Sequence, residues 1–264
     1  MHHRPRKRFG QNFLHDPAVI ARILRAVDPV PGDHLVEIGP GRGAITAGLL
    51  EGAGELDAVE LDRDLVAPLA RLCGGLGRLR IHTADALRFE FCTLAPPGER
   101  LRLVGNLPYN ISTPLLFHLL DQARCIADMH FMLQKEVVER MAAGPGTKTY
   151  GRLSVMLQTW CEVTDLFAIG PDAFTPPPKV HSALVRLRPL DRPRVAVCDP
   201  DVYARVVGLA FGQRRKTLRN ALAPLMDASQ IAAAGVEPGE RAERLGLEAF
   251  SALADAACKS RRTS

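Results

Sequence analysis

The sequence predicts an α/β protein, with an open, mostly parallel β-sheet covered by helices on both faces and followed by a small all-helical domain. From Asp33 onward, short apolar runs rich in β-branched residues alternate with longer segments of helical periodicity. This alternation is typical of a parallel sheet with crossover helices. After about residue 190 the sequence becomes rich in Ala, Leu and Arg. We therefore expect an α/β domain at 1–189, with a basic N-terminal arm, and a small helical domain at 190–264.

The predicted elements follow from apolar periodicity and turn residues. The predicted strands are 34–38, 55–61, 79–85, 101–106, 127–133, 161–169 and 182–189, and the last two are expected to form a closing antiparallel pair. The predicted helices of the first domain are 43–50, 63–73, 112–122, 134–143 and 152–160, with a loop at 144–151. Asp199 and Pro200 suit the N-cap and first turn of the helical domain.

The composition is that of a protein with a large core, because 47% of its 264 residues are apolar. No segment reaches the roughly 18 consecutive apolar residues of a membrane span. The first residues, MHHRPRKRFG, lack the apolar region of a secretory signal. We expect a soluble, cytoplasmic protein that does not contact membranes.

The six cysteines are far apart and contain no C-x-x-C pair. This spacing indicates small buried thiols rather than a disulfide framework or a zinc site. The eight histidines are scattered, and none forms a cluster with carboxylates at the spacing of metal ligands. We expect no bound metal.

The net charge of +5 is unevenly distributed along the chain. Residues 1–25 contain six Lys or Arg against one acidic residue, and residues 185–264 contain fourteen against nine. The segment between them is net acidic. Basic ends around an acidic centre fit a polyanionic partner held by the ends, although solvated basic tails give the same pattern.

The first predicted strand leads into EIGPGRGA (37–44), a glycine-rich turn before a helix. Glycines at such a turn let the backbone approach a ligand closely. Gly39, Gly41 and Ala44 also satisfy the dinucleotide pattern G-x-G-x-x-G/A. A turn that binds no ligand and an NAD-dependent oxidoreductase therefore both remain open from this motif alone.

Two acidic residues follow at the ends of the next strands. Glu60 closes the second strand, where a carboxylate can accept hydrogen bonds from both hydroxyls of a ribose. Asp85 closes the third, where a carboxylate can accept from the exocyclic amine of an adenine. Because these acids and the glycines share one edge of the sheet, they predict a nucleoside with a non-phosphate appendage. No phosphate-binding loop is present in the sequence.

The tetrapeptide NLPY follows the fourth strand at the same edge. The side-chain oxygen of Asn106 and the carbonyl of Leu107 can accept from an amino group and aim its lone pair at an electrophile. Pro108 fixes the turn, and Tyr109 offers a ring on which a flipped base can stack. We assign these residues to the catalytic site, with an amino group of a nucleobase as the target.

Together these motifs resemble the S-adenosylmethionine-dependent methyltransferases of the Rossmann-like class I fold, and NLPY resembles the [ND]-x-P-[YF] motif of enzymes that methylate amino groups of nucleobases. Three further segments are similar to the ribosomal RNA adenine dimethyltransferase family. They are QNFLHD (11–16), FTPPPKVHSALV (174–185) and FGQRRKTLRNAL (211–222). The resemblance extends over essentially the whole chain.

The resemblance implies dimethylation of N6 of two adjacent adenosines near the 3′ end of small-subunit (16S) ribosomal RNA, and a role in small-subunit biogenesis. It implies that Asn12 and Leu14 cover the donor S-adenosylmethionine. It also implies that Gly39, Gly41, Glu60, Asp85 and Asn106 contact this donor. Phe174 is expected to pack near the target base, although a core position for this residue remains open.

The small ribosomal subunit is the expected partner, and a monomer is the default expectation. The predicted RNA-binding residues are Arg214, Arg215, Lys216 and Arg219 on a helix, with Arg4, Arg6, Lys7 and Arg8 in the N-terminal arm. Such cations contact phosphate groups without reading the sequence. Two alternatives remain open: methylation of a large-subunit ribosomal RNA adenine, and a non-catalytic ribosome assembly factor on the same fold.

Overall fold

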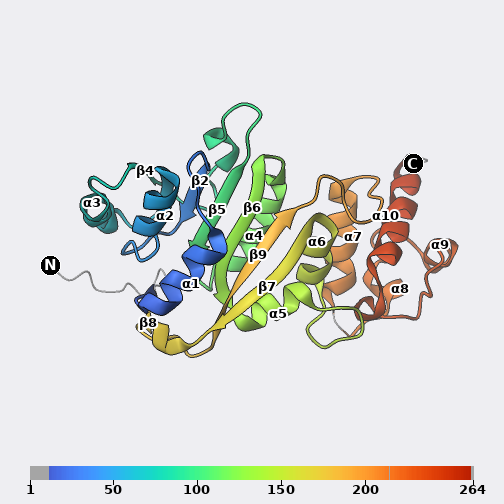
Figure 1. The fold of residues 1–264 in the computed structure, drawn as a ribbon. Helices are drawn as coiled ribbons and strands as arrows, with labels where there is room; N and C mark the ends of the chain where they lie inside the picture. Colours follow the sequence, from blue (N-terminus) through green and yellow to red (C-terminus); the bar gives the residue numbers. More distant parts are fainter. Residues whose placement is uncertain (1–11, 214, 263–264) are drawn as a thin grey trace. The chain divides into compact units, whose positions relative to one another are not determined.

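The computed structural model describes residues 12–213 and 215–262, and the chain divides into two compact units. The first unit comprises the chain up to Val138 together with Thr164–Pro189, and the second comprises Glu139–Val163 and Leu190–Ser264. Figure 1 shows the sheet of the first unit and the helices of the second. The second part of the second unit begins at Leu190, next to the expected boundary at 189. The second unit also contains segment 139–163, which was expected in the first domain.

Segment 139–163 groups with the C-terminal helices, whereas the predicted boundary at 189 places it in the first domain. Its helix α6 (Arg152–Trp160) is largely buried. The hydroxyls of Thr159 and Tyr203 share a hydrogen bond of 2.9 Å, and the hydroxyl of Tyr150 donates to the carbonyl of Leu245 at 2.8 Å. These tertiary contacts join residues far apart in the sequence, so the change in composition at 190 does not reveal them.

The first unit is built on a seven-stranded sheet of order β4-β3-β2-β5-β6-β9-β7. Its strands are β2 (Leu35–Ile38), β3 (Glu55–Glu60), β4 (Arg78–Thr83), β5 (Leu101–Asn106), β6 (Ile126–Gln134), β7 (Cys161–Ile169) and β9 (Ser182–Pro189). The first five of these pair in parallel, and β9 pairs antiparallel with β6. All seven predicted strands are present, and the last two are neighbours as expected.

The position of the site follows from the strand order. On one side of β2 the next strand is β3, and on the other side it is β5. The connections that leave β2 and β5 therefore diverge at the carboxyl edge, which opens a crevice there in folds of this type. The predicted motifs follow these strands.

Helices cover both faces of the sheet (Figure 1). The helices that begin within this unit are α1 (Pro17–Val27), α2 (Thr46–Ala53), α3 (Arg63–Leu72), α4 (Ser112–Asp121) and α5 (Lys135–Ala142). Ile81 packs into the core that includes α1, α2 and α3. The next residue, His82, points to the opposite face because side chains alternate along a strand, and it contacts the ring of Phe89 on the side of α4.

A second, two-stranded sheet joins β1 (Phe13–Leu14) to β8 (Phe174–Thr175). The strands are antiparallel, with Phe13 opposite Thr175 and Leu14 opposite Phe174. Helix α1 follows β1 directly, and the side chain of Asp16 caps it by accepting from the N–H groups of Ala18 and Val19. The two-residue strands were not predicted, because they are too short to show periodicity.

The helices of the second unit after α6 are α7 (Pro200–Gly212), α8 (Leu218–Ala221), α9 (Ala228–Ala233) and α10 (Leu247–Arg262). The predicted N-cap is confirmed, since the carboxylate of Asp199 accepts from the N–H groups of Asp201 and Val202. The prediction of one helix across FGQRRKTLRN is wrong. Helix α7 ends at Gly212, a poor helix former, and a turn closed by Lys216 N–H on the Gln213 carbonyl precedes α8.

The prediction that all six cysteines are unpaired is also wrong for four of them. Cys92 pairs with Cys125 in the first unit, and Cys198 pairs with Cys258 in the second. Cys73 and Cys161 are buried thiols, as expected. The paired residues are 33 and 60 positions apart, so only the tertiary fold brings them together.

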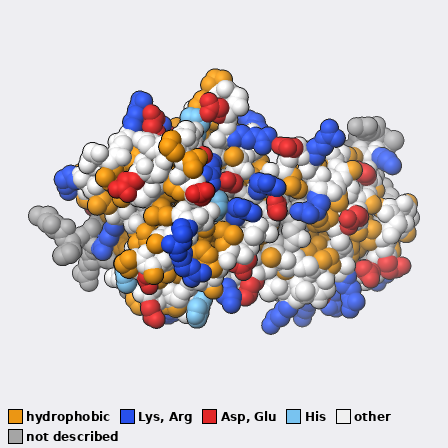
Figure 2. All heavy atoms as spheres, viewed as in Figure 1, with side chains coloured by type: hydrophobic (Ala, Val, Ile, Leu, Met, Phe, Trp, Pro, Cys, Tyr) orange, Lys and Arg blue, Asp and Glu red, His pale blue; other side chains and the backbone are white. Residues whose placement is uncertain are grey.

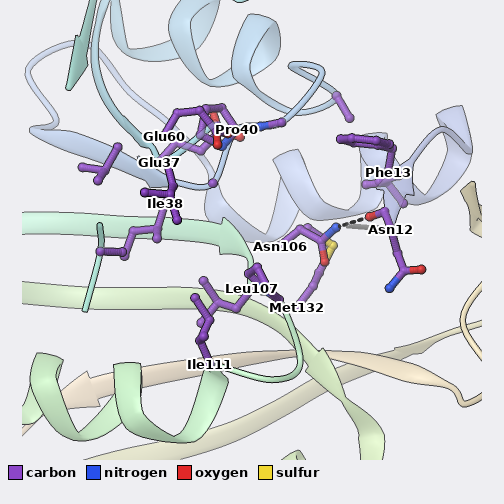
Figure 3. Close-up of a pocket in the computed structure, with 18 of the residues that line it drawn as sticks. Asn12, Phe13, Glu37, Ile38, Pro40, Glu60, Asn106, Leu107, Ile111 and Met132 are labelled. Carbon is purple, nitrogen blue, oxygen red and sulfur yellow. Dashed lines mark hydrogen bonds between the residues drawn. The ribbon is translucent and has the colours of Figure 1, made fainter. Parts of the chain in front are cut away.

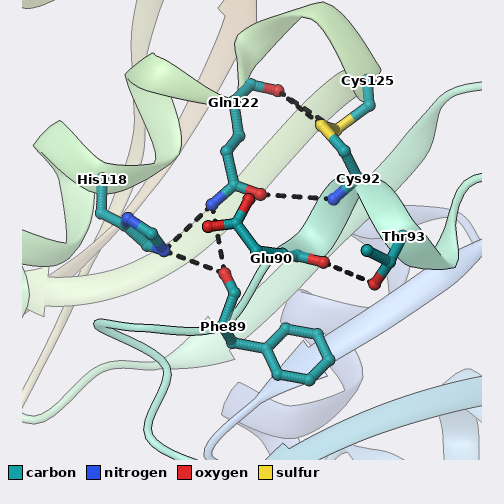
Figure 4. Close-up of a disulfide and its surroundings, with 7 residues drawn as sticks. All are labelled: Phe89, Glu90, Cys92, Thr93, His118, Gln122 and Cys125. Carbon is teal, nitrogen blue, oxygen red and sulfur yellow. Dashed lines mark hydrogen bonds between the residues drawn. A yellow bond between two sulfur atoms is a disulfide. The ribbon is translucent and has the colours of Figure 1, made fainter.

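The Cys92–Cys125 disulfide connects two short 3₁₀ segments, η2 (Phe91–Leu94) and η3 (Ala123–Cys125) (Figure 4). Gln122 reinforces this connection, since its side-chain oxygen accepts from Cys92 N–H and its amide nitrogen donates to the carbonyl of Phe89. The loop after β4 is thereby attached to the end of α4.

None of the described helices combines the length and the apolar character that a membrane span requires.

Candidate active site

A pocket of about 340 Å³ opens at the carboxyl ends of β2, β3 and β5 (Figure 3). It brings together every predicted donor-contacting and NLPY residue. These residues are Asn12, Leu14, Gly39, Gly41, Glu60, Asp85, Asn106, Leu107, Pro108 and Tyr109. Phe174 is not among the lining residues.

The glycine-rich turn after β2 forms one wall of the pocket. Gly39 and Gly41 have φ values of 67° and 60°, in the left-handed region that favours glycine. A Cβ on Gly41 would also lie 3.2 Å from a ring carbon of Phe13. The guanidinium of Arg42 lies 4.4 Å from the centre of the same ring. The turn therefore requires glycine, and β1 packs directly against it.

Glu60 ends β3 with its carboxylate nearly buried, at 6% exposure. One oxygen accepts from Gly41 N–H at 3.1 Å and the other from Asp62 N–H at 2.8 Å. Burial raises the pKa of Glu60, and these backbone N–H groups oppose that shift. A carboxylate offers about four lone-pair positions, so Glu60 retains the capacity to accept from a ribose while its orientation is fixed.

Asp85 lies in the loop that follows β4, two residues beyond the strand end at Thr83. The sequence predicts Asp85 as the last residue of the strand, so the boundary is corrected by two positions. One carboxylate oxygen accepts from Leu87 N–H at 3.0 Å, and Arg88 N–H closes a turn on the Asp85 carbonyl. The turn presents Asp85 to the pocket.

Glu37 also lines the pocket and was not predicted, although it begins the EIGPGRGA segment (37–44). Its side chain is 2% exposed, and within the described residues its Oε2 has no hydrogen-bond partner. Burial, with a smaller contribution from the Glu60 carboxylate, raises the pKa of Glu37 to about 8. The protonated form of Glu37 can donate a hydrogen bond into the pocket.

Asn106 ends β5, and its side-chain nitrogen donates to the backbone carbonyl of Asn12 at 2.9 Å (Figure 3). This contact uses the donor end of the amide and leaves the oxygen as an acceptor. The next residue, Leu107, is 1% exposed, and its N–H donates to the carbonyl of Met132 on β6. Met132 also lines the pocket and was not predicted, because nothing in its strand marks it as a ligand contact.

Tyr109 is only partly buried and lines the pocket beside Asn106. Its hydroxyl shares a hydrogen bond of 2.6 Å with the hydroxyl of Ser182, and its carbonyl accepts from the hydroxyl of Ser112 at 3.1 Å. Burial raises the pKa of the Tyr109 phenol. The phenol is therefore neutral, and hydrogen bonds hold both its hydroxyl and the backbone of Tyr109.

The structure does not bring Phe174 into the pocket. Its side chain is 2% exposed and belongs to the core cluster that also includes Leu14 and Ile169. The pairing of β1 with β8 places Phe174 opposite Leu14. In this conformation the Phe174 ring is not exposed for a base to stack on, and it occupies the core position that the sequence also allows.

Among the predicted RNA-binding cations, Arg215, Lys216 and Arg219 are exposed at the turn and first residues around α8. Arg214 and the arm residues Arg4, Arg6, Lys7 and Arg8 lie outside the described residues. On the face shown in Figure 2, Lys and Arg side chains are distributed among acidic and apolar ones. Within the described ranges, no three or more His, Cys, Asp or Glu side chains are grouped so that they could hold a metal ion.

A family model described as ribosomal RNA adenine dimethylase matches residues 2–258 of this chain. The chain belongs to this family. Its predicted membership of the ribosomal RNA adenine dimethylases is therefore confirmed, and with it the class of enzyme. The competing interpretation of the glycine-rich turn, an NAD-dependent oxidoreductase, is excluded by the same match.

Curated relatives of this adenine dimethylase share more than half of its residues over nearly the full length. "Ribosomal RNA small subunit methyltransferase A" from Pseudomonas aeruginosa is 59% identical over 254 residues, covering 96% of this chain and 94% of the relative. The protein of the same name from Methylococcus capsulatus is 59% identical, covering 96% and 98%. The one from Xylella fastidiosa is 57% identical, covering 95% of each.

Solved structures confirm the fold of this family member. A dimethyladenosine transferase from Plasmodium falciparum superposes with a TM-score of 0.75 at 24% identity, covering 91% of this chain and 95% of that one. The 23S rRNA methyltransferase ErmE superposes with a TM-score of 0.71 at 26% identity, covering 94% and 100%. The predicted class I methyltransferase fold with a helical C-terminal part is therefore confirmed.

Proposed function

We propose that this ribosomal RNA adenine dimethylase transfers methyl groups from S-adenosylmethionine to N6 of two adjacent adenosines near the 3′ end of small-subunit ribosomal RNA, twice per adenosine. The observation that carries the proposal is the Asn106 amide, whose nitrogen is engaged by Asn12 while its oxygen remains an acceptor beside Tyr109. An acceptor next to an aromatic ring suits an exocyclic amine on a flipped base.

The pocket fits the donor in three respects. The backbone around Gly41 allows close approach, and Glu60 is held by two N–H groups in position to accept from ribose hydroxyls. The buried Oε2 of Glu37 has no partner in the described part of the chain, so a ligand donor or acceptor can satisfy it. When bound, S-adenosylmethionine supplies an electrophilic methyl group on its sulfonium.

The residues at the end of β5 act on the acceptor base. The Asn106 side-chain oxygen and the Leu107 carbonyl accept from the amino group, which favours a lone pair directed at the methyl group. Pro108 fixes the turn, and the Tyr109 ring provides a stacking surface. Alanine substitution of such a ring costs about 1–3 kcal/mol per base. The amino nitrogen loses its proton to water after it becomes cationic, so no side-chain base is required.

The proposed substrate is the small subunit rather than the large one. Relatives at 57–59% identity bear the name of small-subunit methyltransferase A, while the 23S methyltransferase structure is 26% identical to this chain. We further propose that Arg215, Lys216 and Arg219, with Arg214, contact RNA phosphates, that the protein acts as a monomer in the cytoplasm, and that it contributes to small-subunit biogenesis.

The test is methyl transfer to small subunits that lack the modification. The protein is incubated with labelled S-adenosylmethionine and these subunits, and the digested RNA is searched for N6,N6-dimethyladenosine. We expect label in this nucleoside at two adjacent positions. Label confined to cytosine or to large-subunit RNA would overturn it. Subunit binding without any label would support the alternative of a non-catalytic assembly factor.

A further inference from the structure

Tyr109 is restrained at both ends by two serines from different parts of the first unit. The Ser112 hydroxyl, in the first turn of α4, donates to the Tyr109 carbonyl at 3.1 Å. The Ser182 hydroxyl, 73 residues further along the chain, shares a 2.6 Å hydrogen bond with the phenol. Pro108, with its fixed φ, precedes the tyrosine, and Ile111 N–H closes a turn on the Pro108 carbonyl.

Ser182 is a rigid anchor for the phenol. It is 1% exposed and begins β9, where it stands opposite Gln134 in the antiparallel pair with β6. The backbone just before it is held too, because Lys135 N–H donates to the carbonyl of His181. Among the described residues, Tyr109 is the one hydrogen-bond partner of the Ser182 hydroxyl. Ser182 does not line the pocket itself.

We infer that Ser182 is a positioning residue, which holds the hydroxyl end of the Tyr109 ring in place so that the target adenine stacks with its amino group at Asn106. The inference rests on the proposed function and extends it to a residue outside the pocket. A phenylalanine at position 109 would present the same ring without this restraint. In this chain the hydrogen bond to Ser182 fixes where the hydroxyl end of the ring lies.

The chemical reason is that methyl transfer requires alignment of the amine lone pair with the methyl group. RNA affinity comes mainly from phosphate contacts, which do not depend on the orientation of one ring. Loss of the Ser182 hydroxyl should therefore lower kcat while the KM for RNA and the affinity for the donor stay unchanged. A net hydrogen-bond contribution of ordinary size corresponds to a loss of about three- to tenfold.

The experiment is a double-mutant cycle with Ser182→Ala, Tyr109→Phe and the combined variant, assayed on unmodified small subunits. We expect each single variant to lose about three- to tenfold in kcat, with unchanged RNA KM and donor affinity. The combined variant should lose no more than either single one, because both changes break the same hydrogen bond. Wild-type kcat in Ser182→Ala, or a combined loss equal to the product of the single losses, would overturn the inference.

A matched control removes another buried hydroxyl. Ser251 is 8% exposed, and its hydroxyl donates to the Ala196 carbonyl in the second unit. Ser251→Ala should leave kcat unchanged and should not alter the effect of Tyr109→Phe. If Ser182→Ala fails to fold, Ser182→Cys keeps a weak donor of similar size, and the same cycle with Cys should give a smaller loss that again does not add to that of Tyr109→Phe.

A second readout does not depend on activity. The chain contains three tyrosines, so a protein with ¹³C-labelled tyrosine rings gives few signals, and Tyr109→Phe identifies that of Tyr109. Ser182→Ala should shift this signal, because the phenol loses its hydrogen-bond partner, while the other tyrosine signals stay in place. An unchanged Tyr109 signal would overturn the inference. Failure of the wild type to form dimethyladenosine would instead overturn the proposed function, and the kinetic cycle would move to the RNA that it does label.

Discussion

The side-chain nitrogen of Asn106 donates a hydrogen bond to the backbone carbonyl of Asn12, 94 residues earlier in the chain, at 2.9 Å. This contact joins the residue proposed to orient the target amine to the segment proposed to cover the donor. It also decides which end of the amide is available, since the nitrogen is used and the oxygen is not. The two halves of the site are therefore coupled through one polar contact.

Substitution of Asn106 is expected to reduce methylation sharply. Asn106→Ala removes the acceptor for the amine, and loss of one oriented polar group at a reacting centre costs about 100-fold in kcat or more. Asn106→Asp should also fail, although the [ND]-x-P-[YF] motif admits Asp, because a carboxylate oxygen would face the Asn12 carbonyl. Single-turnover methylation of small subunits measures both variants.

The neighbouring Asn110 provides the control for this prediction, because it lines the same pocket. Asn110→Asp makes the same chemical change four positions after Asn106 and should cause a much smaller loss of methylation. An Asn106→Asp variant that is as active as the Asn110→Asp variant would contradict the role given to the Asn12 carbonyl.

The two strand-end acids should determine donor affinity to different degrees. Glu60 accepts hydrogen bonds from two backbone N–H groups, one on each oxygen. In Glu60→Gln the side-chain NH₂ group must face one of these N–H groups, and that hydrogen bond is lost. We expect a loss of more than about tenfold in the affinity for S-adenosylmethionine, measured by calorimetry, since hydrogen bonds to charged groups contribute about 1.5–3 kcal/mol. Asp85→Asn retains one oxygen acceptor and should lose less.

Glu51 on α2 is exposed and does not line the pocket, so Glu51→Gln is the matched control and should bind the donor normally. Equal affinity in Glu60→Gln and Glu51→Gln would show that Glu60 does not contact the donor.

The parts of the site that follow parallel strands could be predicted from the sequence. Glu60 and Asn106 end buried strands, and the carboxyl ends of parallel strands meet at one edge, so their proximity follows from the strand order. The glycine turn was recognisable for the same reason. The pairing of β1 with β8 was not, because two-residue strands have no periodicity.

Contacts between distant segments could not be predicted. The Asn106–Asn12 and Tyr109–Ser182 hydrogen bonds join residues 94 and 73 positions apart, and each depends on how loops meet above the sheet. The position of Phe174 depends on the same loops, since β8 directs it toward the core. The Cys92–Cys125 pair was missed because neither residue has a spacing signal.

The buried acid Glu37 predicts a pH dependence of stability. Its pKa in the folded protein is raised to about 8 from an ordinary value of 4.5, so the folded state binds a proton that the unfolded state releases. The stability from this group is fully present below pH 4.5 and is lost as the pH rises through 8, by at most about 1.4 kcal/mol per pH unit.

Glu37→Gln keeps the shape of the side chain and cannot ionise. Without ligand, its free energy of unfolding relative to wild type should therefore increase steadily between pH 5 and pH 8. Urea denaturation at a series of pH values measures this difference. A difference that stays constant across this range would mean that Glu37 is already ionised in the folded protein.

The exposed cations near α8 should control the salt dependence of RNA binding. Each phosphate contact contributes about 0.7–0.9 to the slope of log K against log salt. The combined change of Arg215, Lys216 and Arg219 to Ala should lower this slope by about 2, as measured by binding to small subunits at several salt concentrations. Arg63 and Arg71 on α3 are exposed as well, and their combined change to Ala should leave the slope unaltered.

Phe174 provides a test that separates a core role from a base-binding role. Since the ring is 2% exposed and packs with Leu14, Phe174→Ala should destabilise the protein by about 3–5 kcal/mol. Phe174→Leu retains most of the apolar volume but has no ring, so it should melt only a few degrees lower and keep most of its activity. Thermal unfolding and methylation rates are measured on the same preparations. A Leu variant with wild-type stability but at least tenfold lower activity would show that the ring leaves the core and stacks on the base during the reaction.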